Sequence, residues 1–495
     1  MILGFLIFWP LLAALLLLLK KGDNVKKAAF AASLIELAVT IVAWVQYNPA
    51  LKSNPLLELY CPWIPSMGIN FDIALDGISI LMVFLTTLLV PFIILSSFSK
   101  NYKNPRAFYM LILMMQMALI GVFVSMDGFL FYVFWELALL PIYFICLLWG
   151  GEGRARITFK FFIYTLFGSL FMLATLIYLY LHTQGEHGIA AHSFHIKALY
   201  AAGAAMSAKA QAVFFWCMFL AFAIKMPVFP FHTWQPDTYV NSPTQGTMML
   251  SGIMLKMGTY GMIRWMLPMA PQALHDWGHL AILLSVISII YGSVLAINQH
   301  DFKRLIAYSS IAHVGLIAAG ILAFNVQGVQ GALVQMLSHG INVVGLFFIC
   351  DIVFSRTGTS DISKLGGIRN VAPNFALLSL LVVLGSVALP LTNGFVGEFL
   401  LISGIFQGHP AFAVFAGLTI ILGAVYMLRS YQNIMLGEVN SVTQSFTDLT
   451  FNEKAVLIPM VLLIVGFGVY PKPLLDLVQP GVEALLHNYN VGLIK

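Results

Sequence analysis

Several ionisable side chains lie inside long apolar segments of this 495-residue chain, and six of them could form one functional set. An ionisable group in the middle of a bilayer costs about 2.5–3.5 kcal/mol on insertion scales, so such residues are candidates for function. Burial favours the neutral form of carboxyl and ammonium groups alike, which brings their proton exchange towards neutral pH. The set predicts a proton relay formed by Glu136 in FYVFWELALLP, Lys225 in AFAIKMPVFPFHTW, Lys256 in SGIMLKMGTYG, His313 in YSSIAHVG, His339, and Glu398 in LPLTNGFVGEF.

Further polar residues accompany the two histidines. Ser309 lies one turn before His313, and the spacing of Gln335, His339 and Asn342 places all three on one helix face. Each ionisable group also has a structural interpretation, because a single buried histidine is often a hydrogen-bonded packing group and a Glu–Lys pair can be a structural ion pair. Six such groups on six helices favour the relay. Glu36 has no evident partner, and we assign it a structural role.

The amino-acid composition indicates that these groups belong to a membrane protein. Hydrophobic residues make up 60% of the chain and charged residues 9%, where soluble domains carry about 25% charged residues. The net charge of +5 does not indicate nucleic-acid binding, because the basic residues fall in short loops. The four cysteines (Cys61, Cys146, Cys217 and Cys350) show no CxxC pair, so neither a disulfide framework nor an iron–sulfur site is indicated.

Long apolar runs predict an all-α polytopic membrane protein, with residues 1–495 forming one membrane domain. The run from Ile2 to Leu19 lacks a basic leader and a small-residue cleavage site, so we expect a retained helix. Fourteen spans are expected at 2–19, 28–46, 76–98, 106–126, 128–149, 157–182, 210–236, 244–267, 278–298, 301–323, 327–354, 373–406, 410–436 and 455–471.

The basic residues predict the orientation. Alternating the loops between two sides places sixteen of the 25 Lys and Arg on one side: Lys20, Lys21, Lys26, Lys27, Lys100, Lys103, Arg106, Arg154, Arg156, Lys160, Lys303, Arg304, Arg356, Lys364, Arg369 and Lys454. The other side has six: Lys52, Lys197, Lys209, Arg264, Lys472 and Lys495. The positive-inside rule makes the first side cytoplasmic and puts both termini on the outer face.

Two spans carry helix-breaking residues beside the ionisable groups. Pro227 and Pro230 follow Lys225, whereas Pro390 and Gly394 precede Glu398. Broken helices persist in membranes where they line protein-buried or watery cavities. The interrupted spans, the seventh and the twelfth, are five apart. This spacing suggests two five-helix repeats of inverted topology, spans 4–8 (106–267) and 9–13 (278–436).

The outer loop after the sixth span contains four histidines, His182, His187, His192 and His195. A metal site is conceivable there. A solvated loop is the favoured interpretation, because the spacing fixes no ligand arrangement.

The stretch KMPVFPFHTWQPD followed by SPTQGTMMLSGIMLKMGTYG resembles the signature of the antiporter-like subunits of respiratory complex I and of Mrp-type cation/proton antiporters. The resemblance covers essentially the whole chain. It implies that a Glu–Lys pair, Glu136 and Lys225, modulates a central Lys256. It further implies that His313 and His339 continue the hydrophilic axis to Glu398.

Two features favour the subunit M branch of this family. The resemblance implies a Lys on the twelfth span in the L and N branches and in the antiporters, and a Glu in the M branch. This chain has Glu398 at that position. The L branch also continues into a long lateral helix, and we expect none in the roughly 25 residues that follow the fourteenth span. It departs from the family after Trp234, where relatives commonly have LPDAHxEAP. This chain has QPDTYVNSP, so Tyr239 and Asn241 replace a His and a Glu, while His232 and Asp237 remain.

The resemblance implies a translocase subunit of NADH:quinone oxidoreductase in the inner membrane of a bacterium. Its partners would be the other membrane-arm subunits (L, N and small subunits) and the lipid bilayer. No flavin, nicotinamide or iron–sulfur motif occurs in the chain, so flavin, iron–sulfur clusters and quinone are expected in partner subunits. A subunit of an Mrp-type antiporter is the alternative, and a hydrogenase-linked relative is a third, less favoured one.

Overall fold

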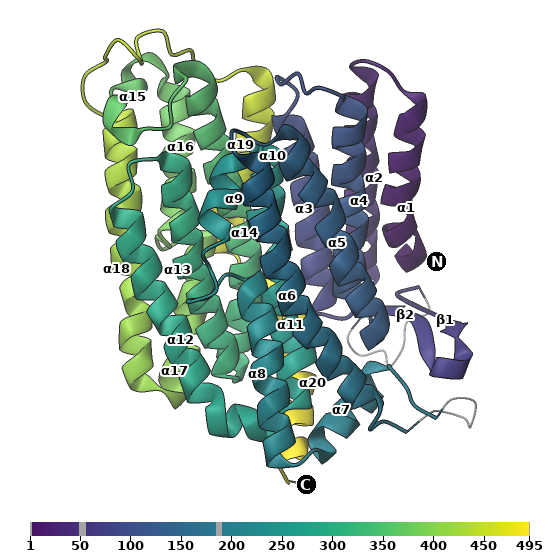
Figure 1. The fold of residues 1–495 in the computed structure, drawn as a ribbon. Coiled ribbons are helices and arrows are strands. Elements are labelled where there is room, and N and C mark those ends of the chain that lie inside the picture. Colours follow the sequence, from purple (N-terminus) through teal and green to yellow (C-terminus); the bar gives the residue numbers. More distant parts are fainter. Residues whose placement is uncertain (1, 49–55, 185–190, 495) are drawn as a thin grey trace.

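The computed structural model describes residues 2–48, 56–184 and 191–494, and these form a helical bundle (Figure 1). In the described part of the chain, twelve helices are long and apolar enough to cross a membrane. They are α1 (Ile2–Leu16, extended by a short 3-10 turn to Leu19), α2 (Asn24–Gln46), α3 (Ser79–Ser96), α4 (Pro105–Val124), α5 (Gly128–Trp149), α6 (Arg154–Tyr180), α8 (Ala208–Lys225), α12 (Pro271–Ile297), α13 (Phe302–Leu322), α14 (Val326–Thr357), α18 (Pro410–Met435) and α19 (Phe451–Val469).

The two remaining expected spans are assembled from shorter pieces. Span 244–267 consists of α10 (Thr244–Met249), a π-helical turn (Leu250–Met254), α11 (Lys256–Gly261) and a second π-helical turn (Met262–Met266). Span 373–406 consists of α16 (Pro373–Ser386) and α17 (Asn393–Gly408). The all-α polytopic fold is thus confirmed.

The expected breaks next to Lys225 and Glu398 are present. Lys225 is the last residue of α8, and irregular backbone follows until α9 (Gln235–Asn241). The link between α16 and α17 contains Ala388 and Leu391, both with positive φ, which is unusual for residues other than glycine. Regular helical structure is therefore interrupted at both places.

Burial identifies the core of the bundle. In the most apolar 18-residue stretch of each helix, 94% of the residues are buried in α13 and in α14 and 89% in α3, whereas 28% are buried in α19. Side-chain caps start both central helices, with Asp301 accepting from Arg304 N and Asn325 accepting from Gly328 N. The surrounding helices therefore expose lipid-facing apolar residues, while α13 and α14 carry polar groups that neighbouring helices cover.

Three elements were not expected from the sequence. Strands β1 (Glu58–Ile64) and β2 (Ile69–Ala74) form an antiparallel hairpin, and α7 (Ile196–Ala205) follows the histidine-containing loop. A further helix, α20 (Lys472–Ile494), follows α19 and packs against α12 and α14. It contains Pro480 and several polar residues, so a search for long apolar runs misses it.

The two ends of the bundle carry different elements. The hairpin, α7 and the end of α20 lie at the lower end in Figure 1, and α15 (Ile368–Val371) lies at the upper end. Helix α1 begins towards the same end at which α20 finishes (Figure 1).

Candidate functional site

Lys256 lies at the centre of the site, between the two π-helical turns. It is fully buried, and its ammonium nitrogen lies 2.7 Å from the carbonyl oxygen of Ser251 and 2.8 Å from Nδ1 of His339. The π-helical turn widens the helix before Lys256, and such turns occur frequently at functional sites. Within the described residues, Lys256 forms no ion pair, so its ammonium is held by neutral groups alone.

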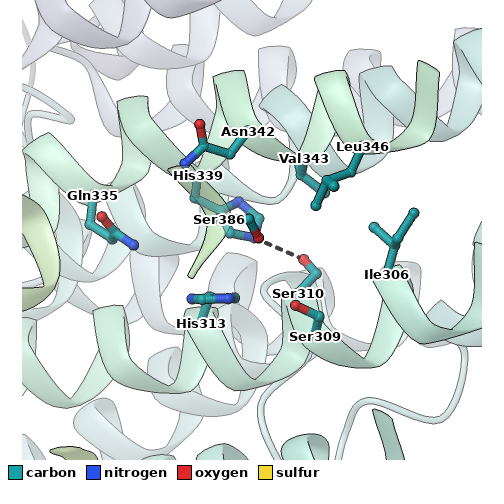
Figure 2. Close-up of a pocket in the computed structure, with 10 residues that line it drawn as sticks. All are labelled: Ile306, Ser309, Ser310, His313, Gln335, His339, Asn342, Val343, Leu346 and Ser386. Carbon is teal, nitrogen blue, oxygen red and sulfur yellow. Dashed lines mark hydrogen bonds between the residues drawn. The ribbon is translucent and has the colours of Figure 1, made fainter. Parts of the chain in front are cut away.

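The contact with His339 continues to a second helix. Nε2 of His339, on α14, lies 3.2 Å from the hydroxyl of Ser310 on α13. Figure 2 shows this bond as a dashed line between the two facing helices. Lys256, His339 and Ser310 therefore form an unbroken hydrogen-bonded series through buried side chains.

His313 and Glu398 form a second group. Nδ1 of His313 lies 2.9 Å from Oε1 of Glu398, and the amide of Gln335 donates to the same oxygen at 3.2 Å. Glu398 is 1% exposed, and its Oε2 has no hydrogen-bond partner among the described residues. Gly397 contacts Gln335 so closely that any side chain there would displace it.

A small cavity lies between the two groups. It has a volume of about 10 Å³ and is lined by polar residues of α13, α14 and α16: Ser309, Ser310, His313, Gln335, His339, Asn342 and Ser386 (Figure 2). Nε2 of His313 and the amide oxygens of Gln335 and Asn342 have no partner within the described ranges. A cavity of this size accommodates about one water molecule. The rings of His313 and His339 are 5.9 Å apart, too far for direct contact.

Glu136 and Lys225 are not connected to each other by a hydrogen bond or an ion pair among the described residues. Lys225 is 3% exposed, and its ammonium lies 5.2 Å from the centre of the Trp135 ring, a cation–π contact. Glu136 is half-buried, and in the part of the chain that is described it forms no ion pair with Lys225. The two charges still interact electrostatically. The structure thus brings four of the six predicted residues together and holds Glu136 and Lys225 apart from each other.

Glu36 also lacks partners. It is fully buried on α2, and neither carboxyl oxygen has a hydrogen-bond partner among the residues described. It lies outside the Lys256–Glu398 region.

The outer loop forms hydrogen bonds rather than a cluster of ligands. His195 pairs with Asp72 at 3.3 Å, and His182 and His192 contact the carbonyl oxygens of Tyr178 and Thr183. His187 lies outside the described residues. No group of three potential metal ligands was found in the described part of the chain.

Two charged clusters were missed from the sequence. Arg264, at the end of the eighth span, pairs with Asp76 at 2.5 Å, close in sequence to the β1–β2 hairpin. In the second cluster, Asp351 accepts from Lys100 and from Thr244, both at 2.6 Å. Asp351 falls within an expected span, so its acidic side chain in an apolar run was a signal that could have identified it.

A polytopic bundle with broken spans around a buried Lys–His–Glu network defines an antiporter-like membrane subunit. The chain belongs to the family described as NADH:quinone oxidoreductase/Mrp antiporter, TM, which matches residues 125–423. It is 40% identical over 489 residues to NADH-quinone oxidoreductase subunit M of Rickettsia conorii, covering 97% of each chain.

Solved structures agree with this assignment. A chain of respiratory complex I from Thermus thermophilus is 29% identical, with a TM-score of 0.88 over 98% of this chain and all of that one. A chain of the Mrp complex from Dietzia sp. has a TM-score of 0.85 at 20% identity, over 100% of this chain and 99% of that one, which shows the shared fold. The expected resemblance to the subunit M branch is confirmed.

Proposed function

We propose that this chain is the proton-translocating M-type subunit of a bacterial NADH:quinone oxidoreductase, coupling quinone reduction elsewhere in the complex to proton pumping. The relay would comprise the six residues predicted from the sequence. The observation that best supports the proposal is the buried contact of 2.8 Å between Lys256 and His339. Two bases in hydrogen-bonding contact, with no counter-ion beside them among the described residues, are suited to exchanging a proton.

The geometry gives this exchange a direction. A protonated Lys256 donates to Nδ1 of His339, which must then carry its own proton on Nε2, facing Ser310. Transfer of the lysine proton to Nδ1 releases the Nε2 proton to the serine hydroxyl. Two positive charges 2.8 Å apart would repel by about 6 kcal/mol at an effective dielectric of about 20, so the pair holds one proton at a time.

From Ser310 the proton would reach His313 through a water molecule in the small cavity. The unpartnered Nε2 of His313 belongs to the lining of this cavity, so such a water would satisfy a buried polar atom. His313 then donates to Glu398 through Nδ1. Because Oε2 of Glu398 forms no protein hydrogen bond within the described ranges, we assign to it the proton released towards the outer face.

Glu136 and Lys225 would act as the switch at the start of the relay. When the carboxylate is close, it stabilises protonated Lys225. When the two separate, desolvation favours release of the proton towards Lys256. The present arrangement, with Lys225 against Trp135, corresponds to the separated state.

Redox chemistry would occur in partner subunits. We infer that flavin, iron–sulfur clusters and quinone lie there, and that this chain contacts the L and N subunits and small membrane subunits. The basic face would be cytoplasmic and both termini would be on the outer side of a bacterial inner membrane. We also propose that residues 106–267 and 278–436 are two inverted repeats.

The alternative is a subunit of an Mrp-type cation/proton antiporter, supported by the shared fold. Glu398 favours the first function, since the family resemblance implies a Lys at this position in the antiporters. Purification of the tagged chain from native membranes distinguishes the two. We expect co-purifying redox subunits and quinone-linked NADH oxidation. An assembly of antiporter subunits without NADH oxidation would exclude the proposal.

A further inference from the structure

A larger cavity, of about 410 Å³, lies at the basic end of the bundle. It is formed where the link between α3 and α4, the end of α5, the link between α9 and α10, the start of α13 and the end of α14 meet. Its rim includes Gly151 and Phe354, which are exposed. The cavity is therefore placed where protons would enter from the side that we assign to the cytoplasm.

Asp351 is the acid within this cavity. It is 6% exposed, and its Oδ1 accepts from Lys100 and from the hydroxyl of Thr244. Lys303 also lines the cavity, but its ammonium donates to the carbonyl oxygens of Val240 and Ser242, at 3.1 and 2.7 Å. The other charged or titratable groups facing the cavity are Tyr102, Asp301 and Cys350.

A buried row of hydroxyl groups leads from Asp351 to the relay. Thr244, Thr247 and Ser251 follow one another at intervals of three and four residues, which places them on one side of the eighth span. The Ser251 hydroxyl donates to the backbone carbonyl of Thr247 at 2.7 Å, and the backbone carbonyl of Ser251 accepts from Lys256 at 2.7 Å, so water molecules would have to bridge one hydroxyl to the next. Thr247 and Ser251 are fully buried. Thr244, which binds Asp351, thus stands at one end of the row and Lys256 at the other.

The nearby loop after the seventh span offers no equivalent acid. Tyr239 is fully buried, and Asn241 donates to the carbonyl oxygen of Glu152. Asp237 pairs with Lys160 at 3.5 Å and with Arg304 at 3.0 Å, and it does not line the cavity. The acidic group closest to the eighth span at this mouth is instead Asp351, from α14.

We propose that this cavity is the proton-uptake vestibule and that Asp351 is its proton-loading group, passing protons along Thr244, Thr247 and Ser251 to Lys256. The proposal rests on the function proposed above. Asp351 would take a proton from water in the cavity as Lys100 moves away. Water molecules bridging successive hydroxyls would then carry the proton, with each hydroxyl accepting one proton and donating its own, and neutral Lys256 would accept the last proton and become the ammonium.

The test compares Asp351→Asn with Glu453→Gln in the assembled complex. Glu453 is the matched control because it pairs with Arg356 at 2.7 Å on the same face and anchors the same helix, but does not line the cavity. Quinone-linked proton pumping is measured in inside-out vesicles between about pH 6 and about pH 8.5. We expect Asp351→Asn to slow pumping several-fold at high pH and to approach wild type at low pH, because a higher proton concentration compensates for a lost loading group.

Glu453→Gln should keep the wild-type pH profile. Thr244→Val, which interrupts the row after the loading group, should slow pumping at every pH. If Asp351→Asn does not assemble, Thr244→Val decides the question. A pumping rate and a pH profile equal to wild type in Thr244→Val overturn the proposal. A wild-type profile or a uniform loss in assembled Asp351→Asn also overturns it. Lys256→Ala tests the underlying function separately, since full pumping in that variant refutes the relay itself.

Discussion

Lys256 and His339 are 83 residues apart in the sequence, yet Nζ of Lys256 lies 2.8 Å from Nδ1 of His339 in a buried site. Neither residue has a carboxylate within hydrogen-bonding distance in the described part of the chain. A permanently charged lysine in such a site would be costly, because isolated charges transferred from water to a protein interior lose several kcal/mol of solvation. The relationship therefore favours a lysine that alternates between charged and neutral forms.

The first prediction concerns the proposed switch. Glu136→Gln and Lys225→Ala should each impair quinone-linked proton pumping, because the Glu–Lys attraction at about 4 Å amounts to roughly 4 kcal/mol at an effective dielectric of about 20. Glu36→Gln is the matched control, since Glu36 is also a membrane-embedded glutamate without an ion pair in the described chain. It should pump normally. Wild-type rates in both switch variants would exclude the switch.

The second prediction concerns Glu398. Glu398→Gln retains an oxygen that can accept from His313 and Gln335, but it cannot release a proton, so pumping should fall strongly. Glu398→Asp should keep a substantial part of the activity, and Glu398→Lys some of it. Proton pumping and NADH oxidation are measured in membranes, with assembly checked on native gels. A fully active Gln variant would assign Glu398 a structural role and place the exit elsewhere.

The third prediction uses Asp127, which caps α5 next to strand β2. Burial raises the pKa of Asp127 to about 6, although its carboxylate accepts backbone N–H bonds from Asn70, Phe129 and Leu130. The folded chain then retains a proton that the unfolded chain loses near pH 4, so this group lowers stability as pH rises from about 4 through about 6. A rise in the pKa from about 4 to about 6 corresponds to at most about 3 kcal/mol.

Asp127→Asn removes this titration while keeping an oxygen that can cap α5. Its stability relative to wild type should therefore rise across the same pH interval. Thermal unfolding of the purified protein at a series of pH values measures the difference. A difference that stays constant between pH about 4 and about 7 would contradict the assignment.

Hydropathy predicted the spans well because lipid imposes one strong requirement on sequence, a long apolar run. It failed for α20, whose buried residues Leu474, Val478 and Leu485 alternate with exposed polar ones around Pro480. The β1–β2 hairpin was also missed. Both elements lie towards the lower end of the bundle in Figure 1, and neither is a long apolar run.

The candidate site was predicted residue by residue, but its connections were not. The contact of Gln335 with Glu398 and that of Lys100 with Asp351 join residues 63 and 251 positions apart. Such contacts depend on helix packing, which local spacing does not encode. The family resemblance predicted a Glu136–Lys225 pair, and packing instead places Lys225 against Trp135.

The central claim is that Lys256 carries the proton rather than a fixed charge, and one measurement tests it most directly. Proton pumping per NADH oxidised is compared in liposomes containing complexes with Lys256→Arg, Lys256→Ala or Lys26→Arg, the last being a partly buried lysine that donates to a carbonyl oxygen elsewhere. Arginine keeps the charge but stays protonated. The account predicts that Lys256→Arg pumps almost as poorly as Lys256→Ala, while Lys26→Arg pumps normally. Restored pumping in Lys256→Arg would contradict it and make Lys256 an electrostatic anchor.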